Sequence, residues 1–307
     1  MFRNDFPDLK YLKHMIAERD NNKWGWPNVI INAQTRSADR PDIKGTLSIF
    51  SNIKGSSFCE ADGHKVRVED DMFFISNDKQ FYTLHIDENQ PTETFNVHFS
   101  TSMLNSFLND KQYSNETMLE RVDNENELHI DFHNQLYKKD EHFNQLITLL
   151  YNKGNTNELT DLMTDELLAS LLFHLQNQYQ TVRQNINHIT TVKSSIREEI
   201  YNRLSKATDY IHSYYPTDIT LDELSSTACM SKFHFLRLFK EVFQATPYQY
   251  ITTVRMQKAA ALLNNSSNAV NEISTFVGYD DASVFSRAFH KYHNQWPQAY
   301  RKAVLAK

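Results

Sequence analysis

Residues 235–250 read FLRLFKEVFQATPYQY, and the outline of this stretch returns fifty positions later in residues 285–300. Both copies follow the pattern F-x-R-x-F, then seven residues, then P-x-x-Y. Upstream, Glu223-Leu224-Ser225 is matched by Glu272-Ile273-Ser274. Solenoids need at least three repeats, and only two are found here. Two copies of a helix–turn–helix unit in one domain indicate a protein that binds its target in two places, and DNA is the first candidate.

Capping residues predict where the helices of the first copy begin. Thr220 with Glu223 is a capping-box signature, and Ser231 can cap the next helix. A third helix starts at Thr246-Pro247-Tyr248-Gln249, with Pro at the first helical position, and runs to about Asn264. In the second copy, Gly278 suits a turn that needs positive φ and Asp281 can cap the last repeated helix.

Each copy places an arginine in mid-helix, on the side away from the apolar stripe. One interpretation is a plain helical bundle in which Arg237 and Arg287 are solvated surface residues. Packing explains the repeated Phe positions, but it gives no reason to repeat an exposed Arg. An arginine on a helix in the major groove can bind guanine O6 and N7, or clamp a phosphate. The repetition therefore favours two recognition helices on one DNA face, about 34 Å apart.

Residues from about 200 to 303 resemble the DNA-binding domain of the AraC/XylS family of bacterial transcription regulators. The match rests on these residues: Thr220–Ala228, Met230-Ser231, Arg237-Leu238-Phe239-Lys240, Pro247-Tyr248-Gln249-Tyr250, Arg255, Ala259, Leu262-Leu263, Glu272-Ile273, Val277-Gly278-Tyr279, Phe285-Ser286-Arg287, Phe289, Pro297 and Tyr300-Arg301. The resemblance implies an all-α domain with two helix–turn–helix units that binds double-stranded DNA.

The resemblance also implies which residues contact DNA. Base-reading positions fall at Phe233, Leu236 and Arg237 in the first unit and at Ala282, Ser283, Ser286 and Arg287 in the second, with Lys232, Lys240 and Lys291 near phosphates. The family commonly has Gly after each recognition helix, whereas this chain has Gln244 and Asn294. Leu236 and Ala282 lack polar reach, so readout there depends on thymine methyl contact or is weak.

Charge divides unevenly along the 307 residues, whose formal net charge is −6. Residues 197–307 hold 13 Lys and Arg against 10 Asp and Glu, which is +3, and residues 1–196 hold 19 against 28, which is −9. The basic excess thus belongs to the half expected to bind DNA. A net charge of +3 is only weakly basic, so it is compatible with DNA binding but does not by itself indicate it. The chain has only two cysteines and no apolar signal-peptide region, which predicts a cytoplasmic protein. It has no run of eighteen apolar residues, so no membrane span is expected.

The N-terminal half predicts β structure. Short β-rich runs lie at 46–50, 65–68, 72–75, 82–86 and 95–99, and Asp62-Gly63 marks a hairpin turn. This spacing indicates a barrel or double-sheet jelly roll. In the family that the C-terminus resembles, the corresponding domain is a cupin-type barrel. The expected fold class is therefore a two-domain α+β protein: an N-terminal cupin-like β-barrel with flanking helices and a C-terminal all-α domain with two helix–turn–helix units.

A metal-dependent enzyme is the competing class for the barrel. Metal cupins use a close His-x-His pair with further ligands, but His85 and His98 stand singly and no His-x-His occurs. His129, Asp131 and His133 alternate with apolar residues, which predicts a strand with these three side chains pointing outward. We therefore expect no catalytic residues, no metal and no cofactor. Aromatic candidates for a pocket are Trp24, Trp26, Phe58, Phe74, Phe81 and Tyr82.

Residues 138–185 predict helices with two apolar stripes. The second stripe contains Leu168, Leu171, Leu172 and Leu175. These leucines either cover the barrel or pack against a second subunit, as similar helices do in dimeric members of the family, and the sequence leaves both open. The expected domains are a sensor barrel over 1–137, a helical dimerisation or packing segment and linker over 138–196, and the DNA-binding domain over 197–307.

The sequence thus predicts a DNA-binding transcription regulator, more an activator than a repressor, that responds to an effector. Expected partners are double-stranded DNA, RNA polymerase, an unidentified small-molecule effector and a second copy of the chain. Two alternatives stay open. Metal analysis would reveal a cupin enzyme with an accessory DNA-binding domain, and the lack of any ligand-induced thermal shift would indicate a constitutive DNA-binding protein whose barrel only dimerises.

Overall fold

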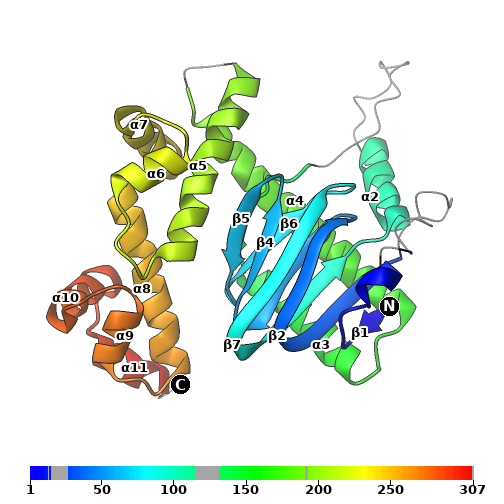
Figure 1. Cartoon of the computed structure of the whole chain (residues 1–307), viewed down its shortest axis with the longest axis horizontal. Helices are drawn as coiled ribbons and strands as arrows, with labels where there is room; N and C mark the ends of the chain where they lie inside the picture. The colour runs from blue at the N-terminus through cyan, green and yellow to red at the C-terminus, as the bar shows by residue number, and fades with distance from the viewer. Residues whose placement is uncertain (13, 15–26, 115–130, 191–192, 306–307) are drawn as a thin grey trace. The chain divides into compact units, whose positions relative to one another are not determined.

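The computed structural model describes residues 1–12, 14, 27–114, 131–190 and 193–305. The chain divides into two compact units, Met1–Val182 and Arg183–Lys307 (Figure 1). The first unit is rich in β-sheet and the second is helical, so the two-domain α+β organisation is confirmed. The functional division at residues 137 and 196 stays a prediction.

One sheet dominates the first unit (Figure 1). Its strands are β1 (Phe2–Arg3), β2 (Val29–Lys44), β3 (Ser48–Lys54), β4 (Ser57–Ala61), β5 (His64–Val68), β6 (Met72–Ser76), β7 (Phe81–His98) and β8 (Leu136–Lys138). The path through the sheet is β1-β2-β7-β3-β6-β8, with β4 pairing with both β7 and β5. Among the described strands, β1, β5 and β8 each have one partner, so the sheet stays open. The closed cupin-like barrel expected from the sequence is not confirmed.

The hairpin turn is where the sequence placed it, but two strand boundaries differ. Asp62 and Gly63 both have positive φ, and Ala61 pairs with His64 across the two-residue turn. The runs at 82–86 and 95–99, expected as separate strands, belong to the single strand β7. Residues 131–133 lie outside any strand, contrary to expectation, and His129 lies outside the described residues.

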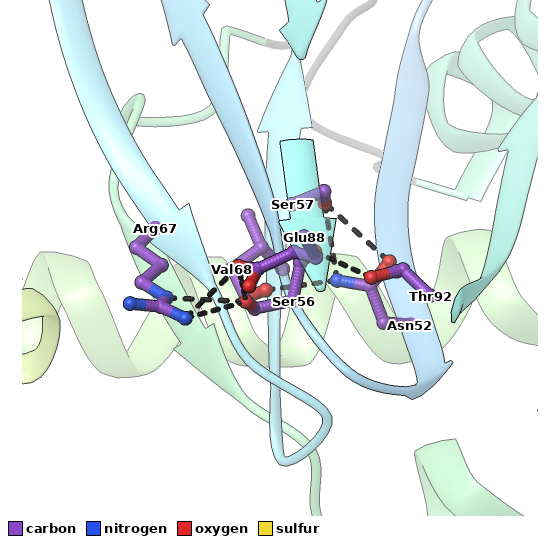
Figure 2. A network of polar contacts seen from close by, with 7 residues as sticks. All are labelled: Asn52, Ser56, Ser57, Arg67, Val68, Glu88 and Thr92. Carbon is purple, nitrogen blue, oxygen red and sulfur yellow. Dashed lines mark hydrogen bonds and ion pairs between the residues drawn. The ribbon is translucent and has the colours of Figure 1, made fainter. Parts of the chain in front are cut away.

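A largely buried polar network lies where strand β7 stops pairing with β4 and begins to pair with β3 (Figure 2). Its members are Asn52, Ser56, Ser57, Arg67, Val68, Glu88 and Thr92. The Arg67 guanidinium donates to Ser56 Oγ over 2.9 Å and to Glu88 Oε1 over 3.0 Å. Asn52 Nδ2 donates to Val68 O over 2.8 Å. Because the ladder is interrupted here, side chains satisfy polar groups that strand pairing leaves over.

Helices cover one face of this sheet (Figure 1). They are α3 (Glu141–Asn155) and α4 (Asp161–Asn187), while α2 (Thr101–Ser114) follows β7. Phe143 of α3 stacks on Phe73 of β6 with ring centroids 4.3 Å apart. On α4, Leu168, Leu171, Leu172 and Leu175 are 0–2% exposed within the single chain. These leucines therefore present almost no surface to a second subunit, and the alternative in which they belong to the core of their own chain describes the structure.

The second unit consists of α5 (Ser194–Tyr214), α6 (Leu221–Thr227), α7 (Lys232–Phe243), α8 (Pro247–Asn265), α9 (Val270–Phe276), α10 (Ala282–His293) and α11 (Pro297–Leu305). The pairs α6–α7 and α9–α10 are the two helix–turn–helix units, and α8 connects them (Figure 1). At 1.5 Å per residue, the 19 residues of α8 span about 28 Å.

The helix starts expected from the sequence are confirmed. Thr220 and Glu223 form a reciprocal capping box, as do Thr246 and Gln249. Ser231 Oγ accepts from His234 N, and Asp281 Oδ1 accepts from Ser283 N over 2.6 Å and from Val284 N over 3.1 Å. Local side-chain chemistry thus sets where α7 and α10 begin.

Candidate nucleic-acid interface

The repeated Phe and Tyr residues fix each recognition helix to the domain in the same way. On α7, Phe239 meets Tyr250 of α8 edge to face, with ring centroids 5.6 Å apart and planes at 88°. On α10, Phe289 meets Tyr300 of α11 at 5.4 Å and 83°. The F-x-R-x-F and P-x-x-Y elements are therefore two halves of one packing contact, made twice.

Burial separates the two faces of α7. Phe235, Leu238, Phe239 and Val242 are buried. The opposite face is exposed at every position predicted to contact DNA: Lys232, Phe233, Leu236, Arg237 and Lys240. Phe233 is 82% exposed, which is unusual for a large aromatic side chain with no partner. Helix α7 thus brings the five predicted positions of the first helix–turn–helix unit together on one solvent-facing stripe.

The corresponding face of α10 is less open. Phe285 and Phe289 are buried, and Ser283, Arg287 and Lys291 are exposed. Ala282 and Ser286 are half-buried, and Ser286 Oγ donates to Ala282 O over 2.7 Å. Tyr292 of the same helix is exposed as well. The second helix–turn–helix unit therefore offers Arg287, Lys291 and Ser283 as its accessible polar groups.

Both recognition helices end on a residue in the left-handed conformation. Gln244 has φ 54° and Asn294 has φ 56°, at positions where the resembled family commonly has Gly. Gln244 Nε2 donates to Glu241 O over 2.7 Å, which satisfies one carbonyl of the last helical turn. The departure from Gly therefore leaves the same helix stop in both units.

Acidic neighbours moderate the charge of the first stripe. Lys232 Nζ forms an ion pair with Asp222 Oδ1, with both side chains largely exposed. Hydrogen bonds from Thr190 hold the pKa of Glu241 below its ordinary value, and the nearby Arg237 acts in the same direction. At the surface such pairs contribute little and can be exchanged for a phosphate.

Arg255 of α8 connects the two helix–turn–helix units, a role that the sequence did not indicate. Its Nε donates to Tyr215 O and its Nη2 to Thr217 O, both over 2.8 Å, in the segment before α6. Its Nη1 donates to Gly278 O over 2.8 Å, in the turn between α9 and α10. Three contacts from one rigid guanidinium fix the two turns to the connecting helix. Arg255 appears in the family signature, but only the structure shows what it holds.

The first unit contains a cavity of about 70 Å³ between β2, β7 and the first twelve residues. Of the predicted pocket aromatics, Tyr82 lines it. Phe74 is buried in the core, Phe58 lies under Lys65 Nζ at 4.8 Å and Phe81 is exposed. Trp24 and Trp26 lie outside the described residues.

His98 also lines the cavity and is neutral at physiological pH. Burial lowers the pKa of its imidazole to about 4. Ser48 Oγ donates its single proton to Thr46 O over 2.7 Å, and His98 Nδ1 lies 2.8 Å from the same oxygen. Nδ1 therefore carries the imidazole proton and donates to Ser48, which leaves Nε2 as an acceptor.

The described residues contain neither a cluster of metal ligands nor a membrane-spanning helix. In that part of the chain, no three His, Cys, Asp or Glu side chains come together as ligands for a metal ion. None of the described helices is long and apolar enough to cross a bilayer.

Residues 224–303 match a family model described as a helix-turn-helix domain. The chain is 28% identical over 158 residues to the lactose operon transcription activator of Staphylococcus xylosus, which covers 51% of this chain and 53% of that protein. It is 31% identical over 143 residues to the raffinose operon transcriptional regulatory protein RafR of Pediococcus pentosaceus, with 47% and 50% covered. The chain thus spans about half the length of the curated relatives it matches.

Among solved structures, the DNA-binding domain of AdpA in complex with a target DNA is similar over 34% of this chain and 94% of that chain. The identity is 25% and the TM-score is 0.33.

Proposed function

We propose, from a C-terminal unit that carries the helix–turn–helix domain of AraC-type transcription regulators, that the whole chain is a sequence-specific DNA-binding regulator of transcription. The observation that carries the proposal is the matched pair α7 and α10. In both helices the repeated Phe residues are buried and the repeated Arg is exposed. A packing requirement explains the first feature but not the second, whereas base or phosphate recognition explains the second.

The proposed contacts follow from what each side chain can reach. Arg237 and Arg287 read guanine edges or clamp phosphates, and Ser283 and Ser286 are candidates for further polar readout. Phe233, Leu236 and Ala282 supply apolar contacts to thymine methyl groups. Lys232, Lys240 and Lys291 hold phosphates, with Lys232 exchanging its exposed Asp222 partner for the DNA backbone.

The regulatory part of the proposal concerns the sheet-rich first unit. Its cavity accommodates a small-molecule effector, and the chain acts in the cytoplasm as an activator that contacts RNA polymerase. The name of the Staphylococcus xylosus relative supports activation over repression. A homodimer remains part of the proposal, but its contact must use surface other than the four buried leucines of α4.

Neither alternative class is favoured by a specific observation. The curated relatives carry names of transcription regulators, which supports a regulator over an enzyme. A purely dimerising sheet domain would have no use for a cavity that combines aromatic walls with arginines.

Selection from random-sequence duplex DNA tests the proposal. The full chain should enrich a defined sequence, and a titration should show preference for it over a shuffled duplex by about a thousandfold or more. The logarithm of the binding constant should fall linearly with the logarithm of salt concentration, because phosphate contacts release counterions. Equal affinity for the selected and shuffled duplexes would show that the chain is not a sequence-specific reader.

A further inference from the structure

The cavity of the first unit combines an apolar wall with two arginines. Phe6, Phe50, Tyr82 and Ile43 supply aromatic and aliphatic surface, and Arg3 and Arg40 supply the charge. Ligand pockets are typically built this way, with mostly apolar linings and a few polar groups that fix orientation. Every described lining residue lies within Met1–Val182.

Arg40 of β2 is held in place by neutral partners. Its Nη1 donates to Asp39 O over 2.9 Å and its Nη2 donates to Pro7 O over 3.3 Å. The guanidinium lies over the Phe6 ring, with Cζ 5.2 Å from the ring centroid. These partners fix the planar group without neutralising its charge, because both hydrogen-bond acceptors are backbone carbonyls.

Arg3 of β1 approaches the same cavity from the start of the chain. Its Nη2 pairs at 3.2 Å with the carboxylate of Asp5, which is well exposed. Its Nε is buried. Nη2 of this guanidinium therefore has a solvent-screened partner, and Nε has none that the described residues provide.

Both arginines leave the same atom unsatisfied. Arg3 Nε and Arg40 Nε are buried and have no hydrogen-bond partner among the described residues. A buried donor without a partner costs about 1–3 kcal/mol, and more when the group is charged. Both residues also line the cavity, and an unsatisfied buried donor in a native structure calls for an explanation such as a group bound nearby.

The identity of the missing group follows from the rest of the lining. No carboxylate lines the cavity in the described part of the chain, so the Arg3 charge has only the exposed Asp5 outside the lining and the Arg40 charge has no anionic partner in the lining. Burial raises the pKa of the Tyr82 hydroxyl, which keeps it protonated and able to donate to an anion. The aromatic wall suits an apolar body attached to that anion.

We propose that this cavity binds a small carboxylic acid, with its carboxylate on Arg3 and Arg40 and its apolar body against Phe6, Phe50 and Tyr82. Arginine is suited to this task because its rigid fork matches carboxylate geometry. The inference rests on the proposed function in one respect, since it names the chemical class of the effector to which the regulator would respond.

A sugar fits this lining less well. A sugar presents many hydroxyl groups that each need acceptors as well as donors. Among the described lining residues, the side-chain acceptors are few, namely Thr46, Asn96 and the neutral His98 beside the Tyr82 hydroxyl. Burying unmatched hydroxyls against Ile43 and Phe50 would cost more than the contacts return.

Thermal unfolding of the full chain with compact acids as probes tests the proposal. Benzoate and hexanoate are the probes, benzamide and hexanol are their neutral counterparts, and lactose is the sugar comparison. At least one acid should raise the melting temperature, while its neutral counterpart and lactose should not. If neither acid raises it, or if benzamide or hexanol does so equally well, the carboxylate assignment is wrong.

Variants locate the site. Arg40→Gln and Arg3→Gln should each weaken binding of the effective acid by about tenfold or more in calorimetric titration, because a charge-assisted contact is lost. Arg36→Gln removes an exposed arginine from the same strand and should bind as the wild type does. Arg3→Gln keeps the test open if Arg40→Gln fails to fold, since Arg3 lies in the two-residue strand β1. Unchanged affinity in a folded Arg3→Gln or Arg40→Gln protein would contradict the assignment.

A DNA titration with and without the acid separates this inference from the proposed function. If the acid binds and DNA affinity does not change, the site stands and the effector-response part of the proposed function fails. If no acid binds but the chain still selects a DNA sequence, the regulator stands and the carboxylic acid site fails.

Discussion

Cys229 and Gly278 occupy the same place in the two helix–turn–helix units, forty-nine residues apart, and both have positive φ. Gly278 also has no room for a side chain. A Cβ there would lie 2.6 Å from Pro216 O and 2.9 Å from Arg255 Nη2. Cys229, with φ 50°, carries a side chain in a conformation that costs an L-residue about 1–2 kcal/mol. The first helix–turn–helix unit therefore retains backbone strain that the second helix–turn–helix unit avoids.

Substitutions at these two positions should have opposite effects on stability. Cys229→Gly should stabilise the helical unit by up to about 1 kcal/mol, since relief of strain exceeds the added freedom of the unfolded chain. Gly278→Ala should destabilise it by more than about 1 kcal/mol, because the new methyl group meets backbone. Urea unfolding followed by circular dichroism measures both. Destabilisation by Cys229→Gly would mean that its left-handed backbone carries no strain.

His98 makes the stability of the sheet-rich unit, Met1–Val182, depend on pH. Its pKa is about 4 in the native protein, against an ordinary value of 6.5. As pH falls from 6.5 to 4, the unfolded chain takes up a proton at this residue and the native protein does not. Stability is therefore lost on acidification through this window, by about 3 kcal/mol from His98 alone.

His98→Asn should reduce that pH dependence, since an asparagine amide can still donate to Ser48 Oγ but does not titrate. Calorimetric unfolding between pH 4 and 6.5 measures the slope. Burial lowers the pKa of His174 as well, so some slope should remain. A slope identical in His98→Asn and wild type would place the buried titration elsewhere.

At the scale of elements, the helical unit was predictable and the sheet was only partly so. Helix starts depend on local chemistry, as at Thr220 and Asp281, and such signals are present in the sequence itself. Strand length depends on partners far along the chain. β7 continues through Pro91 because β2 pairs with it along both halves, which no local pattern reveals. Closure of the sheet is likewise a long-range property, and the expectation of a barrel was not confirmed.

Helix α4 supplies a test of what its leucine stripe does. Leu171 is fully buried, so Leu171→Ala should destabilise the first unit by about 2–5 kcal/mol. Leu162 lies on the same helix and is 71% exposed, so Leu162→Ala should change stability by less than about 0.5 kcal/mol. Denaturant unfolding of the full chain gives both values. A Leu171→Ala protein of wild-type stability but altered mass in light scattering would restore the stripe to a subunit contact.

At the scale of the whole molecule, the sequence predicted the face that we propose contacts DNA, but not what orients its two halves. The repeat located Arg237 and Arg287, because repetition of an exposed residue is visible in the chain. The bonds from Arg255 to Tyr215, Thr217 and Gly278 join segments remote in sequence, so only the structure reveals them. The two arginines of the cavity were also invisible, since Arg3 and Arg40 line one cavity only when β1 pairs beside β2.

The central claim is that α7 and α10 each read part of one DNA site. The most direct test titrates Arg237→Ala and Arg287→Ala against the selected duplex and a set of its single-base variants at fixed salt. Each substitution should weaken binding by about 1–3 kcal/mol and remove base preference in one half of the site, with the two halves about 34 Å apart. Lys206→Ala, which removes an exposed charge from α5, should keep base preference in both halves. Wild-type affinity and unchanged base preference in both arginine variants would contradict the account.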